Sequence, residues 1–232
     1  MLTINFYSCA RLSAASDGGA ATASPMTLAQ VVDNLIAKND DRARELKSYQ
    51  GRRTYTVLYH GFPKDLEARM VASIQYEAPN TKQFKIISQS GPKLLVDKVL
   101  KRLLTTETEA QQKDTREAVN LDRKNYNFSD LRYEPEADGC SYVLSVEPKK
   151  SNKYLYRGTI RVNNQDFAVC DIQAEPAENP SFWIKSTKIN ETYEKVGDVW
   201  LPEQNKSVSR MRFGGTATLT ILYQDYKVQT QE

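Results

Sequence analysis

The pattern of hydrophobic and polar positions is most regular between Tyr154 and Val228, where turn residues divide the chain into alternating segments. Asparagine and aspartate end the first segment at 163–166, and the dipeptides Gly-Asp at 197–198 and Gly-Gly at 214–215 accept the positive φ angles of tight hairpin turns. The expected strands cover 154–162, 167–173, 182–194, 199–213 and 216–228. This spacing predicts an antiparallel meander.

The chain before this meander begins with a helical spacing, because Leu28, Val31, Val32 and Leu35 recur at intervals of three and four residues. We therefore expect an amphipathic helix that begins near Thr27. Alternating patterns typical of strands then follow at 49–60, 65–77 and 84–90, and again at 126–134 and 140–147.

A second helical segment is expected after Gly91-Pro92, because proline is favoured in the first turn of a helix. Its broad apolar stripe consists of Leu95, Val96, Val99, Leu100, Leu103 and Leu104. Beyond Thr105 the chain is highly polar as far as residue 124, which indicates either a fraying continuation of the helix or an exposed connector. Glu107 and Glu109 in this stretch are interpreted as a solvated face.

The order of elements is thus a helix, three strands, a helical insertion and about seven further strands, without an internal repeat. The strands have one apolar face and therefore need a partner layer, which another sheet, helices or a bound apolar ligand could supply. Helices are too few for an α/β fold. We expect an α+β fold in which one curved antiparallel sheet wraps around two helices.

Composition restricts the possible functions. With 32 basic and 29 acidic residues the net charge is only +3, which argues against nucleic acid as a partner. The basic pairs Lys149-Lys150 and Arg52-Arg53 are interpreted as solvated positions of a loop or strand edge. No apolar run reaches the roughly 18 residues of a membrane-spanning helix, so the chain is not expected to cross a membrane with one.

The sequence indicates no catalytic, metal or cofactor site. It lacks the motifs of serine hydrolases, zinc peptidases and phosphate-binding loops. The single histidine, His60, is expected to cap a turn or face solvent, so we expect no enzymatic activity. Cys9, Cys140 and Cys170 show no metal-ligand spacing. Cys140 and Cys170 lie in strand-like segments, where either a disulfide or two buried free thiols would fit, and the free thiols are the favoured alternative.

Residues 1–25 form a separate N-terminal segment. They lack the charged start and apolar core of a secretory signal, yet the small residues at 21–23 resemble the A-x-A site of signal cleavage. We expect either a disordered tail or the remnant of an export signal, followed by a single domain at 26–232.

Several short motifs in the second half of the chain point to a known family. They are Asn125-Tyr126-Asn127-Phe128, Asp138-Gly139-Cys140, Gly158-Thr159-Ile160, Asp166-Phe167-Ala168-Val169, Phe182-Trp183-Ile184-Lys185 and Gly215-Thr216-Ala217-Thr218-Leu219-Thr220. Through them the chain resembles the LolA-like superfamily of bacterial outer-membrane lipoprotein-sorting proteins, which also contains LolB-like receptors and periplasmic regulators of envelope stress. The resemblance is strongest from Tyr126 to Val228.

This resemblance implies an unclosed half β-barrel with helices covering its concave face. It also implies a periplasmic carrier that binds lipoprotein acyl chains or lipid in an apolar groove for outer-membrane sorting. An inner-membrane transporter and an outer-membrane receptor would be its further partners. The alternative is an envelope-stress sensor or interaction module that uses the same groove to recognise lipoproteins, and the absence of a further domain or membrane tether in this sequence favours the carrier.

The resemblance also implies where the ligand would bind. The helix from Pro92 to Leu104 would be the lid of the groove, and Arg52 and Arg53 are candidates for the arginine that holds it. The expected groove and lid residues are Leu95, Val99, Leu100, Leu103, Phe84, Ile86, Trp183, Trp200 and Phe213. Trp183 and Trp200 are expected on strands of the same curved sheet, with at least one of them in contact with the cavity.

Overall fold

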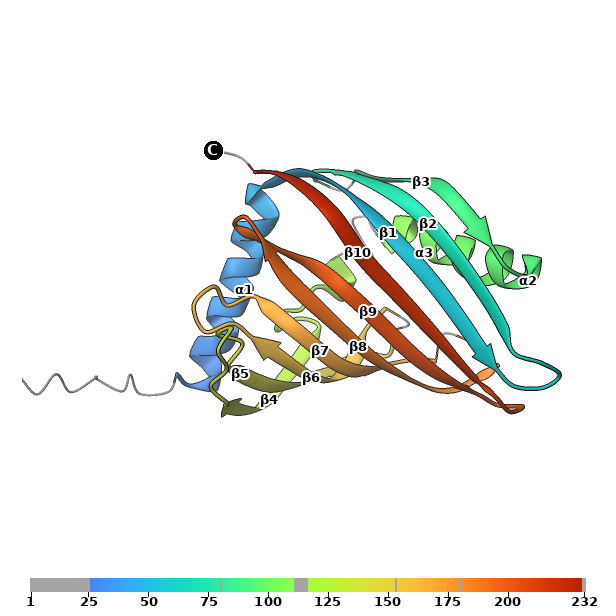
Figure 1. Cartoon of the computed structure of the whole chain (residues 1–232). Helices are drawn as coiled ribbons and strands as arrows, with labels where there is room; N and C mark the ends of the chain where they lie inside the picture. The colour runs from blue at the N-terminus through green and yellow to red at the C-terminus, as the bar shows by residue number, and fades with distance from the viewer. Residues whose placement is uncertain (1–25, 80, 111–116, 153, 180, 231–232) are drawn as a thin grey trace, which may run out of the picture.

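A single ten-stranded antiparallel sheet forms the body of the molecule (Figure 1). The computed structural model describes residues 26–79, 81–110, 117–152, 154–179 and 181–230. The strands are β1 Leu46–His60, β2 Leu66–Glu77, β3 Thr81–Ser90, β4 Tyr126–Tyr133, β5 Tyr142–Pro148, β6 Tyr156–Val162, β7 Val169–Pro176, β8 Ile184–Val196, β9 Val199–Met211 and β10 Thr216–Thr230. They lie in the order β3-β2-β1-β10-β9-β8-β7-β6-β5-β4.

The sheet curves strongly but does not close into a barrel. Its edges are β3 and β4, and among the described residues no pairing joins these two strands. Long hairpins with right-handed twist curl the sheet into a trough, and the helices lie on its concave side (Figure 1). The α+β half-barrel expected from the sequence is therefore confirmed, as are all ten of the expected strands.

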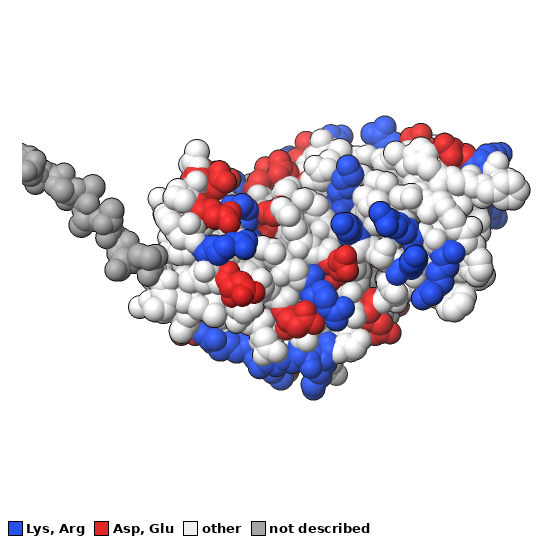
Figure 2. Space-filling model, turned by 90° about the horizontal axis from the view of Figure 1, so that it is seen from below, with Lys and Arg blue, Asp and Glu red and all other residues white. Residues whose placement is uncertain are grey.

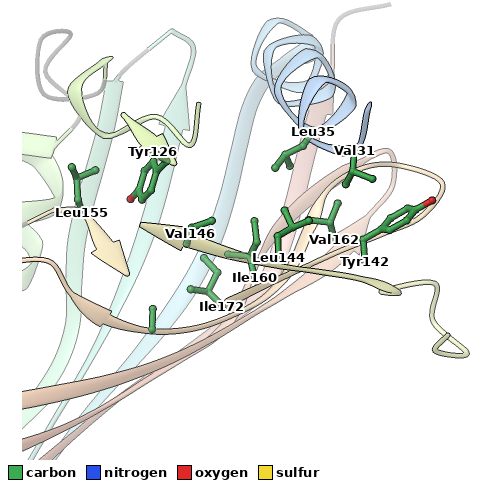
Figure 3. Packing of buried hydrophobic residues seen from close by; sticks show 11 residues of the cluster. Val31, Leu35, Tyr126, Tyr142, Leu144, Val146, Leu155, Ile160, Val162 and Ile172 are labelled. Carbon is green, nitrogen blue, oxygen red and sulfur yellow. The ribbon is translucent and has the colours of Figure 1, made fainter. Parts of the chain in front are cut away.

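Helix α1 (Leu28–Glu45) covers one end of the trough. It begins with a capping box, in which the backbone N–H of Gln30 donates to Oγ1 of Thr27 and the N–H of Thr27 donates to Oε1 of Gln30. Val31 and Leu35 point from the helix toward Leu144 and neighbouring side chains of the sheet (Figure 3). This packing forms the largest apolar core of the described residues, with Leu144, Val146, Ile160, Val162 and Ile172 on the sheet side.

The second helical segment follows the edge strand β3 and packs on the concave side of the sheet (Figure 1). It consists of α2 Lys93–Leu95, the π-helical turn η1 Val96–Leu100 and α3 Lys101–Ala110, which we call together the connecting helices. The helix expected after Gly91-Pro92 is confirmed, and it continues through the polar residues beyond Thr105 to Ala110. Residues 111–116 of the expected connector, and all of the N-terminal segment 1–25, lie outside the described residues.

Cys140 and Cys170 form a disulfide, so the expectation of two free thiols was wrong. Their Cα atoms are 6.2 Å apart although 30 positions separate them in the sequence. The intervening strand β6 ends at Val162, and beyond this end the residues before β5 can approach the start of β7. Hydrophobic alternation places residues on a face of a strand but does not report this distance between non-neighbouring strands.

Candidate ligand-binding site beneath the connecting helices

An apolar seam runs between the connecting helices and the concave face of β1, β2 and β10. The buried side chains of the seam are Tyr55, Val57, Ala68, Met70, Ala72, Val96, Leu100 and Leu104. Against them pack Phe84, Leu95, Val99, Leu103, Leu219 and Ile221. Five of the residues expected in the groove and lid, namely Phe84, Leu95, Val99, Leu100 and Leu103, are thus brought together.

Helical spacing explains why the connecting helices supply so much of this apolar surface. Val96, Leu100 and Leu104 follow one another at intervals of four and form a single stripe along the segment. All three are buried against the sheet, whereas Leu94 lies off this stripe and is 65% exposed. The connecting helices therefore fill the seam with aliphatic side chains, in the manner of a plug.

One ionic cluster fastens the connecting helices to the sheet. The Nη1 of Arg53 on β1 lies 2.5 Å from Oε2 of Glu107, and Nζ of Lys82 on β3 lies 2.7 Å from Oε1 of the same carboxylate. Arg53 is only 3% exposed, and its guanidinium lies 4.6 Å from the centre of the Tyr223 ring and 5.5 Å from that of Phe84. The interpretation of Arg53 and Glu107 as solvated was wrong, because both point into the trough and pair there. Arg53, and not the exposed Arg52, which pairs with Asp225, is the arginine that contacts the connecting helices.

The charge state of this cluster follows from competition between burial and pairing. Burial by itself would raise the pKa of Glu107, but the positive charges of Arg53 and Lys82 outweigh it, and the pKa lies below its ordinary value. Burial would lower the pKa of Arg53, but the Glu107 carboxylate more than compensates and raises it. The pair is therefore charged at neutral pH and joins α3 to two strands at once.

The middle of the trough is more polar than an acyl groove was expected to be. Four residues lie opposite one another on neighbouring strands: Glu191 on β8, Asn205 on β9, Ile221 on β10 and Tyr55 on β1. Directly paired residues share one face of the sheet, so all four point to the concave side. The Nδ2 of Asn205 donates to Oε2 of Glu191 over 3.2 Å, and burial raises the pKa of this carboxyl. Burial likewise raises the pKa of Tyr223 and of Tyr193 well above the ordinary value. The apolar seam is thus confined to the part of the trough beneath the connecting helices.

The other four expected groove residues lie elsewhere. Ile86 is exposed on the edge strand β3. Trp200 on β9 donates from Nε1 to Oδ2 of Asp166 and lines a cavity of about 210 Å³ beside α1. Trp183 lies in the turn before β8, not on a strand. It is exposed at one end of the sheet, where its ring is tilted against that of Phe213. The expectation that both tryptophans are strand residues was therefore wrong for Trp183, because an apolar run looks the same in a strand as in the turn before it.

Sequence reasoning missed Glu107 as the partner of Arg53, and Lys82 as the second cation paired with Glu107. For Glu107 a signal was available: it follows Leu100, Leu103 and Leu104 at intervals of seven, four and three, and so lies on the buried face of the helix. A lone carboxylate on an apolar helical face requires a buried cation nearby. No comparable signal identifies Lys82, which is one of two lysines on a mostly exposed edge strand.

Comparisons with known proteins concern the fold. No family model matches the sequence, and no curated protein matches it. Among solved structures, a DUF1329 family protein from Desulfovibrio piger is 12% identical with a TM-score of 0.41, over 86% of this chain and 92% of that one. A LolA superfamily protein from Nitrosomonas europaea is 12% identical with a TM-score of 0.36, over 87% and 94% of the two chains. An outer membrane lipoprotein-sorting protein domain from Vibrio parahaemolyticus is 10% identical with a TM-score of 0.38, again over 87% and 94%. We assign no site residue and no ligand from these similarities.

The described part of the chain contains no helix with the length and apolar character needed to cross a membrane.

Proposed function

We propose that this protein is a carrier that binds an acyl chain of a lipoprotein or lipid in the seam, with the connecting helices acting as a lid. The observation that supports this most directly is how the connecting helices are attached. Among the described residues they pack on the sheet mainly through aliphatic side chains and are held by the ionic cluster around Glu107. Such an attachment can exchange for another apolar occupant once the cluster opens.

The chemistry of the seam suits an acyl chain. When Val96, Leu100 and Leu104 leave the sheet, they uncover a surface formed by residues such as Tyr55, Val57 and Met70. A methylene chain presents to this surface the same kind of contact that the leucine side chains make. The ligand then replaces the contacts of the helices, so that the free-energy cost of opening is largely offset.

The start of the connecting helices has the backbone of a hinge. Gly91 precedes α2 with φ +107, and a Cβ at this position would lie 2.6 Å from the Cα of Ala68. A side chain would therefore be excluded by both conformation and space. Gly91 lets the chain turn sharply off β3, and in the proposal it is the pivot about which the lid moves.

The disulfide supports a location outside the reducing cytosol. Disulfides such as Cys140–Cys170 persist in oxidising compartments, of which the bacterial periplasm is one. A periplasmic carrier would meet acyl chains between the two membranes of the cell envelope. In this setting an inner-membrane transporter would supply the cargo and an outer-membrane receptor would accept it.

A binding experiment with a fluorescent acyl probe tests the proposal. Parent protein should bind the probe saturably, and Glu107→Gln should bind it at least about fivefold more tightly, because less free energy is needed to open the lid. Glu109→Gln is the matched control, since Glu109 is an exposed carboxylate two positions away on the same helix, and it should bind as the parent does. Absence of saturable binding, together with native mass spectra of envelope-purified protein that show no acyl species, would overturn the carrier. Binding of an unacylated lipoprotein segment in preference to the probe would favour the interaction module instead.

A further inference from the structure

Four exposed aromatic side chains lie at the end of the sheet where two hairpins turn. Phe62, Phe182, Trp183 and Phe213, which we call the aromatic tip, are 91%, 71%, 58% and 77% exposed. The Trp183 ring lies 5.8 Å from the ring of Phe182 and 5.5 Å from that of Phe213. Phe62 belongs to the β1–β2 turn, which touches the β9–β10 turn, because a Cβ on Gly61 would lie 3.0 Å from the Cα of Gly215. So much aromatic surface in one exposed place is typical of an interaction site.

The aromatic tip is held in position by specific contacts. The Nε of Arg212 donates to the carbonyl oxygen of Phe182 over 2.6 Å, and its guanidinium lies 5.3 Å from the centre of the Phe182 ring. The backbone N–H of Arg212 also donates to the carbonyl oxygen of Trp183 over 2.9 Å. The turn that carries two of the aromatic residues is therefore fastened to the hairpin that carries Phe213. The rings project from a built structure that presents them together.

The parts of β8, β9 and β10 next to the aromatic tip carry only positive charge, whereas the β1–β2 hairpin with Phe62 also contains Asp65 and Glu67. Residues 181–190 and 204–222 contain Lys185, Lys188, Lys206, Arg210 and Arg212 but no aspartate or glutamate. Pairing places Lys188, Lys206 and Arg210 on the face opposite to buried Thr187, which is the convex face of the sheet. Figure 2 shows Lys and Arg side chains gathered toward the right-hand end of the molecule, where the hairpins turn in Figure 1.

We propose that the aromatic tip and the adjoining basic strands dock this protein on the surface of an anionic lipid bilayer. Aromatic rings partition into the interfacial region of a membrane, and neighbouring lysine and arginine side chains are attracted to anionic headgroups. The tip protrudes at the end of two hairpins, so a planar, deformable surface fits it best. The basic residues of 181–190 and 204–222, where aspartate and glutamate are absent, provide the matching charge. This docking does not depend on acyl binding and can be tested without cargo.

Sedimentation with vesicles tests the docking. The full chain should co-sediment with phosphatidylcholine vesicles that contain phosphatidylglycerol, bind vesicles of phosphatidylcholine alone much more weakly, and dissociate as salt is raised. Trp183→Ser with Phe213→Ser, and separately Lys188→Glu with Arg210→Glu, should each weaken binding by about tenfold or more. These positions are exposed, so the unfolding midpoints of the variants should stay close to that of the parent.

Two controls carry changes of the same kind at the opposite end of the strands. Tyr133→Ser removes an exposed aromatic side chain at the end of β4, and Lys47→Glu with Lys227→Glu reverses two exposed charges at the start of β1 and near the end of β10. Both controls should bind vesicles as the parent does. Equal losses in the controls and the tip variants would mean that net charge or stability governs binding, and would overturn the assignment of the tip.

Tryptophan emission gives a second, independent measurement. The chain has two tryptophans, so Trp200→Phe leaves Trp183 as the only reporter. Anionic vesicles should shift its emission to shorter wavelength, and brominated lipids should quench it. If the protein sediments with the vesicles while this emission stays unchanged, the tip does not enter the interface and the proposal fails. It fails equally if the parent does not bind anionic vesicles at low salt.

Discussion

Arg53 on β1 and Glu107 on α3 lie 54 positions apart in the sequence, yet their side chains meet inside the trough with Nη1 and Oε2 2.5 Å apart. Lys82 on β3 contacts the other oxygen of the same carboxylate. This one residue of the connecting helices therefore bridges two strands of the sheet. The stability of the closed arrangement should depend on Glu107 far more than its position in a polar stretch of sequence suggests.

Replacing Glu107 with glutamine should loosen the connecting helices while the rest of the fold persists. The neutral amide keeps the size of the side chain but leaves Arg53 buried without a counter-charge, and loss of a hydrogen bond to a charged group costs about 1.5 to 3 kcal/mol. Amide hydrogen exchange of residues 101–110 should accelerate accordingly. Glu109→Gln should leave the exchange rates unchanged, and similar acceleration in both variants would show that the ionic cluster is not the fastening.

The ionic contacts of Glu107 with Arg53 and Lys82 should weaken at acid pH. The pKa of Glu107 is lowered in the folded state, so its contribution to stability is fully present above the unfolded value of about 4.3 and is lost as pH falls through the lower, folded value. Exchange at residues 101–110 in the parent, corrected for the intrinsic rate at each pH, should therefore rise toward that of Glu107→Gln in acid. A constant difference between the two proteins across the acid range would contradict this charge assignment.

Glu191 should behave in the opposite sense. Burial raises its pKa, so its contribution to stability is present below the unfolded value and is lost as pH rises through the higher, folded value. Glu191→Gln keeps an oxygen that can accept the bond from Asn205 and removes the buried charge. The variant should be more stable than the parent at neutral pH and should lose this advantage below about pH 4, near the unfolded pKa. Urea unfolding at each of these pH values measures the difference in stability between variant and parent. A variant that is less stable than the parent at neutral pH would mean that a partner in the fold stabilises the charged carboxylate of Glu191.

The sequence predicted the course of the chain better than the contents of the trough. Strand alternation and hairpin turns such as Gly214-Gly215 are local signals, and they located the ten strands and the amphipathic α1. The stripe through Leu100 likewise identified the segment that covers the sheet. Local signals do not tell which strand faces which helix across the trough, so the pairing of Arg53 with Glu107 was invisible. They also do not separate a groove aromatic from an exposed one, and for that reason Trp183 and Phe213 were expected in the seam.

Removal of the disulfide should destabilise the protein without opening the seam. Cys140→Ser with Cys170→Ser releases a loop closed over a sequence separation of 30, which the chain-entropy relation values at roughly 3 to 4 kcal/mol. The urea midpoint of the double variant should fall, and the parent treated with reductant should fall by a similar amount. Affinity for an acyl probe should not change, because the disulfide lies at β5 and β7, away from the connecting helices. A parent that reacts fully with an alkylating reagent at these cysteines before reduction would show that the bond is absent.

The last prediction separates a lid from an ordinary structural helix. Leu100 is fully buried in the seam, and truncation of such a leucine to alanine costs about 2 to 5 kcal/mol in the unit to which it belongs. If the connecting helices open as a unit of their own, Leu100→Ala should accelerate amide exchange at residues 96–110 while global unfolding of the sheet, followed at β8 and β9, stays near that of the parent. Leu94→Ala is the matched control, since Leu94 is an exposed leucine of the same segment and its truncation should change neither measurement. If Leu100→Ala lowers global stability and helix protection by the same free energy, the connecting helices unfold only with the sheet. The connecting helices would then not open on their own to admit an acyl chain to the seam, and the proposal that they act as a lid would have to be abandoned.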